Sequence, residues 1–182
     1  MRWKALFEDM EAQLAAADQA IGDAEVADRV RQEQGAVTLA DRFRGQLGFV
    51  LRVGTSGGGS FDGELTHVGS EWLVLSTQPG EAMVPLTAVR LVEGLGRNVL
   101  TETSRVQKGL GLGSALRTLA RDRAAVTVHI VEGATRIEGI IDRVGKDFLE
   151  IAAVLPGEAR RTTSVSAVYA VPFSGLAAVS SR

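Results

Sequence analysis

The chain repeats itself: residues 63–75 read GELTHVGSEWLVL, and residues 139–151, which lie 76 positions further on, read GIIDRVGKDFLEI. The aromatic Trp72 of the first stretch is matched by Phe148 of the second at the same offset. In both stretches a Val-Gly pair and two polar residues separate two apolar runs. This pattern is typical of a tight β-hairpin in which glycine can adopt a positive φ. The repeat therefore predicts that two parts of the chain form the same hairpin.

The match continues beyond the hairpin with small changes of offset. Residues 79–82 (Pro-Gly-Glu-Ala) recur as residues 156–159, and Ala-Val at 88–89 recurs as Ala-Val at 167–168. Pro-Gly is a signal for a type II turn, because proline fixes one φ and glycine supplies the other. Insertions that fall in turns and leave the strands in step are expected of duplicated β modules.

Further elements precede each hairpin. An alternating apolar strand is expected at residues 47–53 and again at 126–131, and a helix is expected before each strand, at 38–44 and 114–123. The sequence therefore predicts a mostly β fold with N-terminal helices (α+β). It consists of two tandem small five-stranded antiparallel β-barrels, each preceded by a helix. The expected boundaries are 1–37 for a helical N-terminal arm, 38–96 for the first barrel, 97–113 for a linker and 114–182 for the second barrel.

Each copy resembles the Sm/LSm-like barrel in its helix, its five short strands and the glycine of its second strand, Gly63 or Gly139. The resemblance implies ring-like assembly through outer strands, and RNA binding. The RNA-gripping residues of that family do not carry over: its loop Asp and Asn are replaced by Gly-Ser-Glu at 69–71 and Gly-Lys-Asp at 145–147, and its Arg-Gly is missing. The strands also resemble the PRC-barrel of RNA-processing and ribosome-maturation factors, in which a Val-Pro-Leu-like segment closes the barrel. The choice between the two families stays open.

Apolar residues in the arm alternate at steps of four and three, as in the seam of an amphipathic helix or short coiled coil; they are Trp3, Phe7, Met10, Leu14, Ala17 and Ile21. Asp23 is a good N-cap for a second helix, which carries Val26, Val30, Val37, Ala40 and Phe43 on one face. The arm either packs on the barrels as a helical hairpin or forms a coil for dimerisation or partner docking. Its acidic polar face disfavours binding to anionic lipid.

Composition narrows the function classes. The 182 residues are 45% hydrophobic and carry a net charge of −2, which indicates a globular protein without global attraction for nucleic acid or lipid. The absence of cysteine excludes disulfides and thiolate metal sites. No apolar run could span a bilayer and no secretory pattern begins the chain, so we expect a cytoplasmic protein without a membrane partner. The predominance of Arg over Lys, with abundant Ala, Gly and Val, indicates a GC-rich bacterial genome.

Three patterns suggest chemistry, and each has a simpler explanation. Residues 54–58 fit G-x-S-x-G around Ser56, but a second strand follows where a hydrolase needs a helix, so we expect a glycine-rich hairpin loop. Residues 109–113 (GLGLG) have the wrong spacing for a dinucleotide loop and are interpreted as linker, with Ser114 capping the next helix. The histidines, His67 and His129, lack further zinc ligands. We expect no enzyme, no catalytic residue, no metal and no cofactor.

Basic residues cluster in the linker, the second helix and the loops of the second copy. Arg97, Arg105 and Lys108 precede the candidate RNA- or phosphate-binding residues, which are Arg117, Arg121, Arg123, Arg143, Lys146, Arg160 and Arg161. A solvated helix face explains this cluster more simply than a phosphate-contacting patch does, because stacking aromatics are scarce. The sequence therefore favours a protein-interaction or assembly module with a protein partner or a homo-oligomer. RNA binding is the alternative, and we expect no DNA partner.

Overall fold

The computed structural model describes residues 28–104, 109–133, 135–154 and 165–181, together with Met10, Gln13 and Gln19. The chain divides into two compact units, 1–38 and 39–182. In the first unit, residues 28–36 are helical and exposed, while most of the apolar seam expected for the arm lies outside the described residues. None of the described helices is long and apolar enough to cross a membrane.

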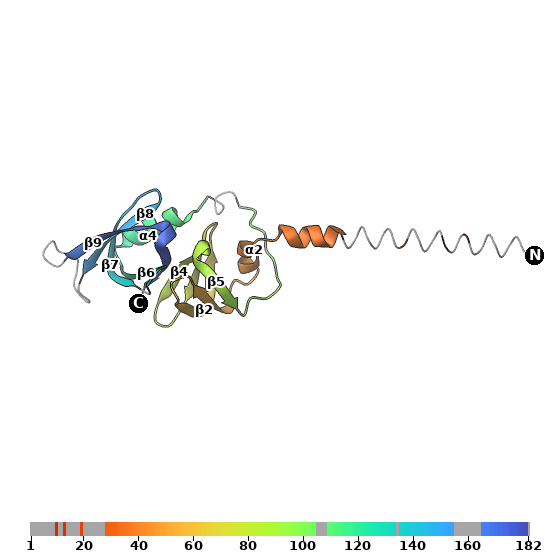
Figure 1. The fold of residues 1–182 in the computed structure, drawn as a ribbon, viewed down its shortest axis with the longest axis horizontal. Coiled ribbons are helices and arrows are strands. Elements are labelled where there is room, and N and C mark those ends of the chain that lie inside the picture. Colours follow the sequence, from red (N-terminus) through yellow and green to blue (C-terminus); the bar gives the residue numbers. More distant parts are fainter. Residues whose placement is uncertain are drawn as a thin grey trace, which may run out of the picture. The chain divides into compact units, whose positions relative to one another are not determined.

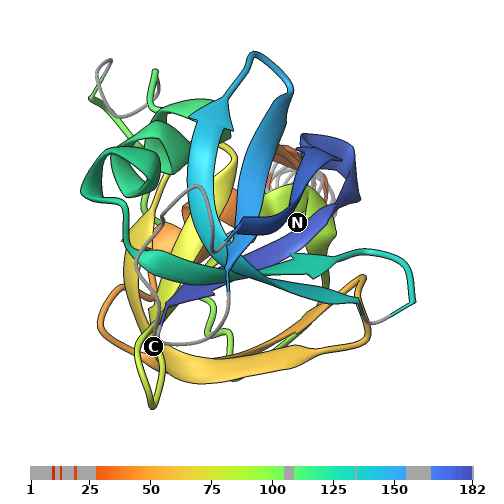
Figure 2. The same ribbon diagram turned by 90° about the vertical axis from the view of Figure 1, so that its left-hand side faces the viewer.

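The second unit begins with a helix and five strands, which are followed by a second helix and five more strands (Figures 1 and 2). The first set is α2 (Leu39–Arg44), β1 (Val50–Thr55), β2 (Ser60–Val68), β3 (Trp72–Ser76), β4 (Glu81–Pro85), the 3₁₀ turn η1 (Leu86–Ala88) and β5 (Val89–Glu93). The second set is α4 (Leu112–Asp122), β6 (Ala125–Ile130), β7 (Arg136–Val144), β8 (Phe148–Val154), β9 (Val165–Pro172), the 3₁₀ turn η2 (Phe173–Gly175) and β10 (Leu176–Ser181).

The strands form one antiparallel sheet in the order β5-β1-β2-β3-β4-β10-β6-β7-β8-β9. The order within the second five repeats the order within the first five. The halves join where β4 pairs with β10, with Met83 opposite Val179 and Ala82 opposite Ser180. The expected mostly β fold is therefore confirmed. Two closed barrels are not shown, because the described sheet runs on from one half into the other and ends at β5 and β9.

Glycines take the same roles in the two halves. A Cβ added to Gly63 in β2 would lie 2.2 Å from the carbonyl oxygen of Ser76, and one added to Gly139 in β7 would lie 2.2 Å from that of Ala152. Neighbouring strands thus approach so closely that only glycine fits. Both hairpin strands then contain an irregularity of register, at residues 65–67 in β2 and 141–143 in β7.

The two hairpin loops also agree in detail. The amide of Gly69 donates a 2.8 Å hydrogen bond to the carbonyl of Trp72, as the amide of Gly145 does to Phe148. Each glycine lies under the aromatic ring, since an added Cβ would come within 2.4 Å of Trp72 or 2.3 Å of Phe148. The shared order and loops support the duplication, which stays a prediction.

The expected correspondence of residues 88–89 with residues 167–168 is wrong. Ala88 ends η1 and Val89 begins β5, whereas Ala167 and Val168 lie inside β9. The structural counterpart of Pro85, which precedes η1, is Pro172, which precedes η2 in the same extended conformation. The mismatch arises because the connection between β8 and β9 is longer than that between β3 and β4. The recurrence of Pro-Gly-Glu-Ala at 156–159 lies outside the described residues.

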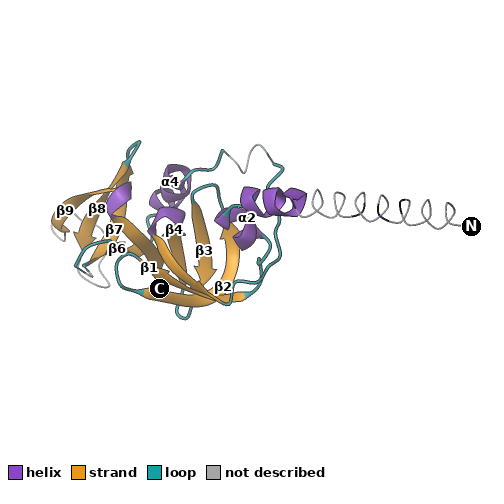
Figure 3. Ribbon diagram, turned by 45° about the vertical axis from the view of Figure 1, so that its right-hand side comes forward, coloured by secondary structure: helices purple, strands orange, loops and turns teal. Residues whose placement is uncertain are grey.

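Each half has its own apolar core, and the two cores share strands at the junction. Phe43 of α2 is fully buried in the first core, as Leu116 of α4 is in the second. Val74 and Met83, on β3 and β4, belong to the core of the second half, whereas Ala178 of β10 belongs to that of the first. Strands at the junction are therefore apolar on both faces. Figure 3 shows these bent strands in orange and the two helices in purple.

Candidate binding surfaces

The outer edges of the sheet are apolar and exposed. On β5, Leu91 exposes 68% of its surface, and on β9, Val168 and Tyr169 expose 57% and 46%. Among the described strands, β5 pairs only with β1, and β9 pairs only with β8. Each edge therefore presents apolar side chains beside a strand with no described neighbour on its outer side.

These outer edges correspond to the two strands that meet inside the chain. The register of the strands shows this correspondence. Val92 of β5 pairs with Val53 in the first half, and Val179 of β10 pairs with Val128 at the same position of the second half. Likewise, Met83 of β4 pairs with Val74, and Ala170 of β9 pairs with Glu150. Thus β5 is the counterpart of β10, and β9 is the counterpart of β4. The β4–β10 junction is one contact between two surfaces whose counterparts lie free at the two ends of the sheet.

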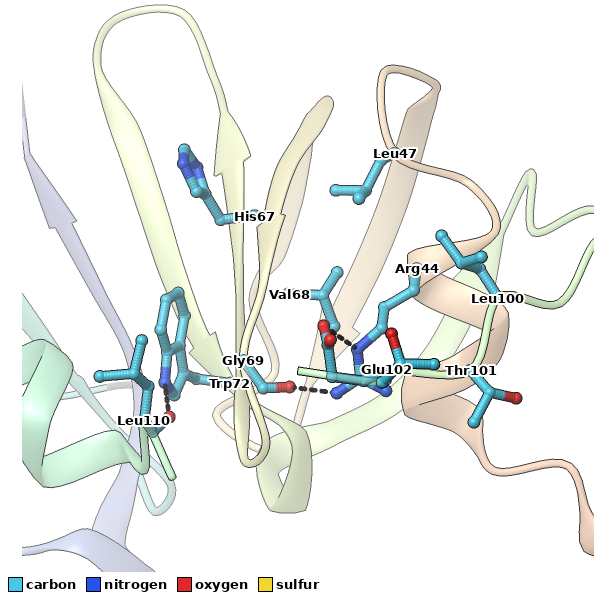
Figure 4. Close-up of a pocket in the computed structure, with 11 residues that line it drawn as sticks. Arg44, Leu47, His67, Val68, Gly69, Trp72, Leu100, Thr101, Glu102 and Leu110 are labelled. Atoms are coloured by element: carbon cyan, nitrogen blue, oxygen red, sulfur yellow. Dashed lines mark hydrogen bonds and ion pairs between the residues drawn. The ribbon is translucent and has the colours of Figure 1, made fainter. Parts of the chain in front are cut away.

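A pocket of about 390 Å³ lies beside α2 in the first half. Its lining comes from the end of α2, the β2–β3 hairpin and the segments around residues 100–103 and 110 (Figure 4). Arg44 lies between Gly69 and Glu102 in this pocket, while Trp72 and Leu110 form the opposite side (Figure 4). Arg44 Nη2 donates to the carbonyl of Gly69 at 2.9 Å, and Nη1 lies 2.9 Å from Asp41 Oδ1. Hydrophobic side chains surround a neutralised arginine.

The same position in the second half is basic, and its described side chains are exposed. Arg117 follows the buried Leu116 in α4, as Arg44 follows Phe43 in α2, and its Nη2 donates to the carbonyl of Gly145 at 3.0 Å. Arg117, Arg121, Arg143 and Lys146 are all exposed. Because α4 packs against β7 and Arg117 contacts Gly145, the structure brings α4 and the β7–β8 hairpin together.

The remaining expected site residues are placed only in part. Arg123 ends α4 with a left-handed φ of 50° and is exposed. Arg160 and Arg161 lie outside the described residues, as do Arg105 and Lys108. The structure thus brings five of the expected cations to α4, its C-terminal end and its neighbouring hairpin, and it leaves the contribution of the β8–β9 connection untested.

The start of α4 binds a carboxylate of the first half. Glu71 Oε2 accepts a 3.1 Å hydrogen bond from the amide of Leu112, and an added Cβ at Gly111 would lie 3.0 Å from the same oxygen. The expected cap by Ser114 is wrong, because the helix begins two residues earlier and its N-cap residue, Gly111, makes no side-chain capping bond. A carboxylate occupies the helix terminus where a dinucleotide loop would need to bind phosphate.

The histidines and Ser56 lie in separate places. His67 lines the Arg44 pocket, whereas His129 lines two other cavities; its Nε2 is 2.9 Å from Ser180 Oγ, and its ring makes an edge contact with Phe61. Burial, helped by the positive charge of Arg136, lowers the pKa of His129. The hydroxyl of Ser56 is buried without a hydrogen-bond partner. No group of three or more potential metal ligands occurs among the described residues.

A comparison with known protein families and with curated proteins finds no match. The sequence interpretation missed the free edges and the contacts of Arg44 and Glu71. The edges could not be read from alternation, because which strands end the sheet depends on tertiary pairing. Two of these contacts, Glu71 with Leu112 and Arg44 with Glu102, join residues 41 and 58 positions apart, and no local sequence pattern indicates such distant partners.

Proposed function

We propose that this chain is a non-enzymatic cytoplasmic assembly module, built on tandem Sm-like small barrels, that forms homo-oligomers through the outer strands of its sheet. The observation that carries the proposal is the β4–β10 junction. Within the chain, the β4 edge of the first half already pairs with the β10 edge of the second half. The counterparts of both surfaces are exposed at β9 and β5.

The proposed contact joins β9 of one copy to β5 of the next. An exposed strand with apolar side chains offers unpaired backbone groups that another strand can satisfy. Since β5 and β9 differ, the contact is heterologous, and each added copy leaves one β5 and one β9 free until a ring closes. Transferring the register of the junction places Val92 of one copy opposite Ala170 of the next.

The test uses one lysine substitution on each edge. Leu91→Lys blocks β5 and leaves β9 intact, whereas Val168→Lys blocks β9 and leaves β5 intact. We expect each variant alone to have the mass of one chain in sedimentation experiments, while the wild type forms larger species as its concentration rises. An equimolar mixture of the two variants should form a dimer and nothing larger, since only one compatible pair of edges remains.

Val50→Lys is the matched control, because Val50 exposes 73% of its surface on β1, which is not an edge strand of the sheet. This variant should assemble like the wild type. A wild type that stays monomeric at every concentration would contradict the proposal. A mixture of the two variants that stays monomeric would contradict it too. If assembly instead joined two like edges, such as β5 to β5, one of the two variants would still assemble on its own.

A further inference from the structure

The first half shows how a segment of chain is held against the helix of this module. Residues 97–104, here called the strap, follow β5 and run back past α2. The amide of Leu100 donates to the carbonyl of Asp41 at 3.0 Å, and Arg42 Nη2 donates to the carbonyl of Gly96 at 2.6 Å, just before the strap. An added Cβ at Gly45 would lie 2.3 Å from the carbonyl oxygen of Asn98. The strap is thus in direct backbone contact with the end of α2.

A carboxylate of the strap faces the arginine at the end of α2. Glu102 Oε2 lies 3.9 Å from Arg44 Nε, and Asp41 Oδ1 completes the pairing on the other side. The side chain of Arg44 is only 10% exposed, and the side chains of Asp41 and Glu102 are each 14% exposed. The arginine is therefore buried between two carboxylates and the hairpin carbonyl.

The second half has the same arginine without these carboxylates. Arg117 keeps the bond to the hairpin glycine, but Ser114 stands at the position of Asp41, and none of the ion pairs between described residues involves Arg117. Arg117, Thr118 and Arg121 are all exposed, so no described segment covers this side of α4. Among the described residues, none occupies in the second half the position that Glu102 has in the first.

The surroundings of Arg117 favour an acidic ligand. Arg121 lies one helical turn further along α4, on the same face, and Lys146 follows the glycine that Arg117 contacts. Arg143 lies on β7, against which α4 packs. With Arg123, these five cations outnumber the nearby carboxylates, which are Asp122, Asp142, Asp147 and Glu150, the cross-strand neighbour of Arg143. In the first half, the corresponding Arg44 is bonded to the hairpin glycine and paired with Glu102.

We propose that α4 and the β7–β8 hairpin bind an acidic extended segment of a partner protein, with a carboxylate on Arg117 as Glu102 is on Arg44. This surface lies on the helix and hairpin, whereas the proposed self-assembly uses β5 and β9. The two proposals therefore stand or fall separately. Thr118 occupies the position of Gly45, so the bound segment lies further from the helix than the strap does, and side-chain carboxylates provide more of the contact.

The test measures binding of labelled peptides to the full chain by fluorescence anisotropy. The probes are a twelve-residue peptide of alternating Thr and Glu, the same peptide with Gln in place of Glu, and a single-stranded RNA of equal length. We expect the acidic peptide to bind, the Gln peptide to bind much more weakly, and Arg117→Ala to weaken binding about threefold, because an exposed ion pair contributes modestly. Binding should also weaken as salt rises.

Two further variants separate binding from folding. Arg121→Glu lies outside the bond to Gly145 and should also weaken binding of the acidic peptide, whereas Arg136→Ala, an exposed arginine at the far end of β7, should not. Equal losses in Arg117→Ala and Arg136→Ala would overturn the proposal, because attraction would then be unspecific. Failure of the acidic peptide to bind at low salt would overturn it too. Binding of the RNA without the peptide would assign the surface to phosphate.

Discussion

At the scale of single residues, glycine determines how closely strands approach in both halves. The positions of Gly63 and Gly139 leave no room for a methyl group, because a neighbouring carbonyl oxygen lies 2.2 Å from where it would be. The side chain cannot avoid this contact by changing rotamer, since the clash involves Cβ itself and a backbone atom. These residues explain why the repeated sequence keeps a glycine inside a strand, where glycine is otherwise unfavourable.

We predict that Gly139→Ala lowers the free energy of unfolding by about 1–3 kcal/mol, the range typical of overpacked cores. Urea denaturation measures the effect. Gly59→Ala is the matched control, because the nearest atom to an added Cβ at Gly59 is 4.0 Å away. It should change the midpoint little. Equal midpoints for the wild type and Gly139→Ala would show that β7 and β8 can separate without cost.

His129 makes the stability of the second unit depend on pH. Burial is the first cause of its lowered pKa, and Arg136 is the second. In the unfolded chain the imidazole regains its ordinary pKa of 6.5, so between that pH and the lower folded-state pKa the unfolded chain binds more protons. The free energy of unfolding should therefore fall as pH drops below about 6.5 and level off once the folded imidazole is also protonated.

Chemical denaturation between pH 7.5 and about pH 5 tests this dependence. His129→Gln should remove the histidine contribution, so that the difference in stability between wild type and variant changes with pH. His67→Gln serves as a control for the loss of a histidine at an exposed position. A constant difference for His129→Gln would show that the folded protein protonates His129 as easily as the unfolded chain does.

At the scale of elements, local pattern predicted most strands and helices because each repeats a short apolar alternation. The expected helix at 114–123 begins at Leu112, and the expected strand at 126–131 is β6 at 125–130. The sequence-based predictions were wrong where contacts between residues far apart in the chain, or connections of different length, set the position of an element. Glu71 moves the start of α4, and the longer β8–β9 connection breaks the simple offset that related residues 88–89 to 167–168.

From the sequence, only the basic composition of the candidate site could be predicted. A run of arginines indicated a basic surface, but its meaning depends on which cations are already paired. Arg44 and Arg117 look alike in sequence, and only the fold shows that Asp41 and Glu102 neutralise the first. Asp41 precedes Arg44 by only three residues, but Glu102 follows Arg44 by 58, so no local pattern reveals the second pairing.

At the scale of the whole molecule, the two halves share their cores. Val74 and Met83 come from the first half and pack in the core of the second. Neither half can therefore unfold without exposing apolar surface of the other, and the unit from 39 to 182 should unfold in a single step.

We predict that Met83→Ala shifts the unfolding of both halves together, by about 2–5 kcal/mol, as for other large-to-small core changes. A Trp3→Phe background leaves Trp72 as the only tryptophan. Because Trp72 begins β3 and packs against the core of the second half, its fluorescence reports on the junction while far-UV circular dichroism reports on the whole sheet. The two denaturation curves should coincide before and after the substitution. Separate midpoints would show that the halves are independent folding units.

The β4–β10 junction has a consequence for how the protein responds to its own abundance. Inside one chain the two surfaces are connected, so their pairing is intramolecular and does not depend on protein concentration. The proposed counterpart between chains has no tether, and Glu150 and Ala170 stand where the junction has Val74 and Met83. The β4–β10 pairing within each chain should thus always be formed, whereas the proposed β9–β5 pairing between chains should increase with protein concentration. Cells could set the length of the assembly simply by how much of the protein they make.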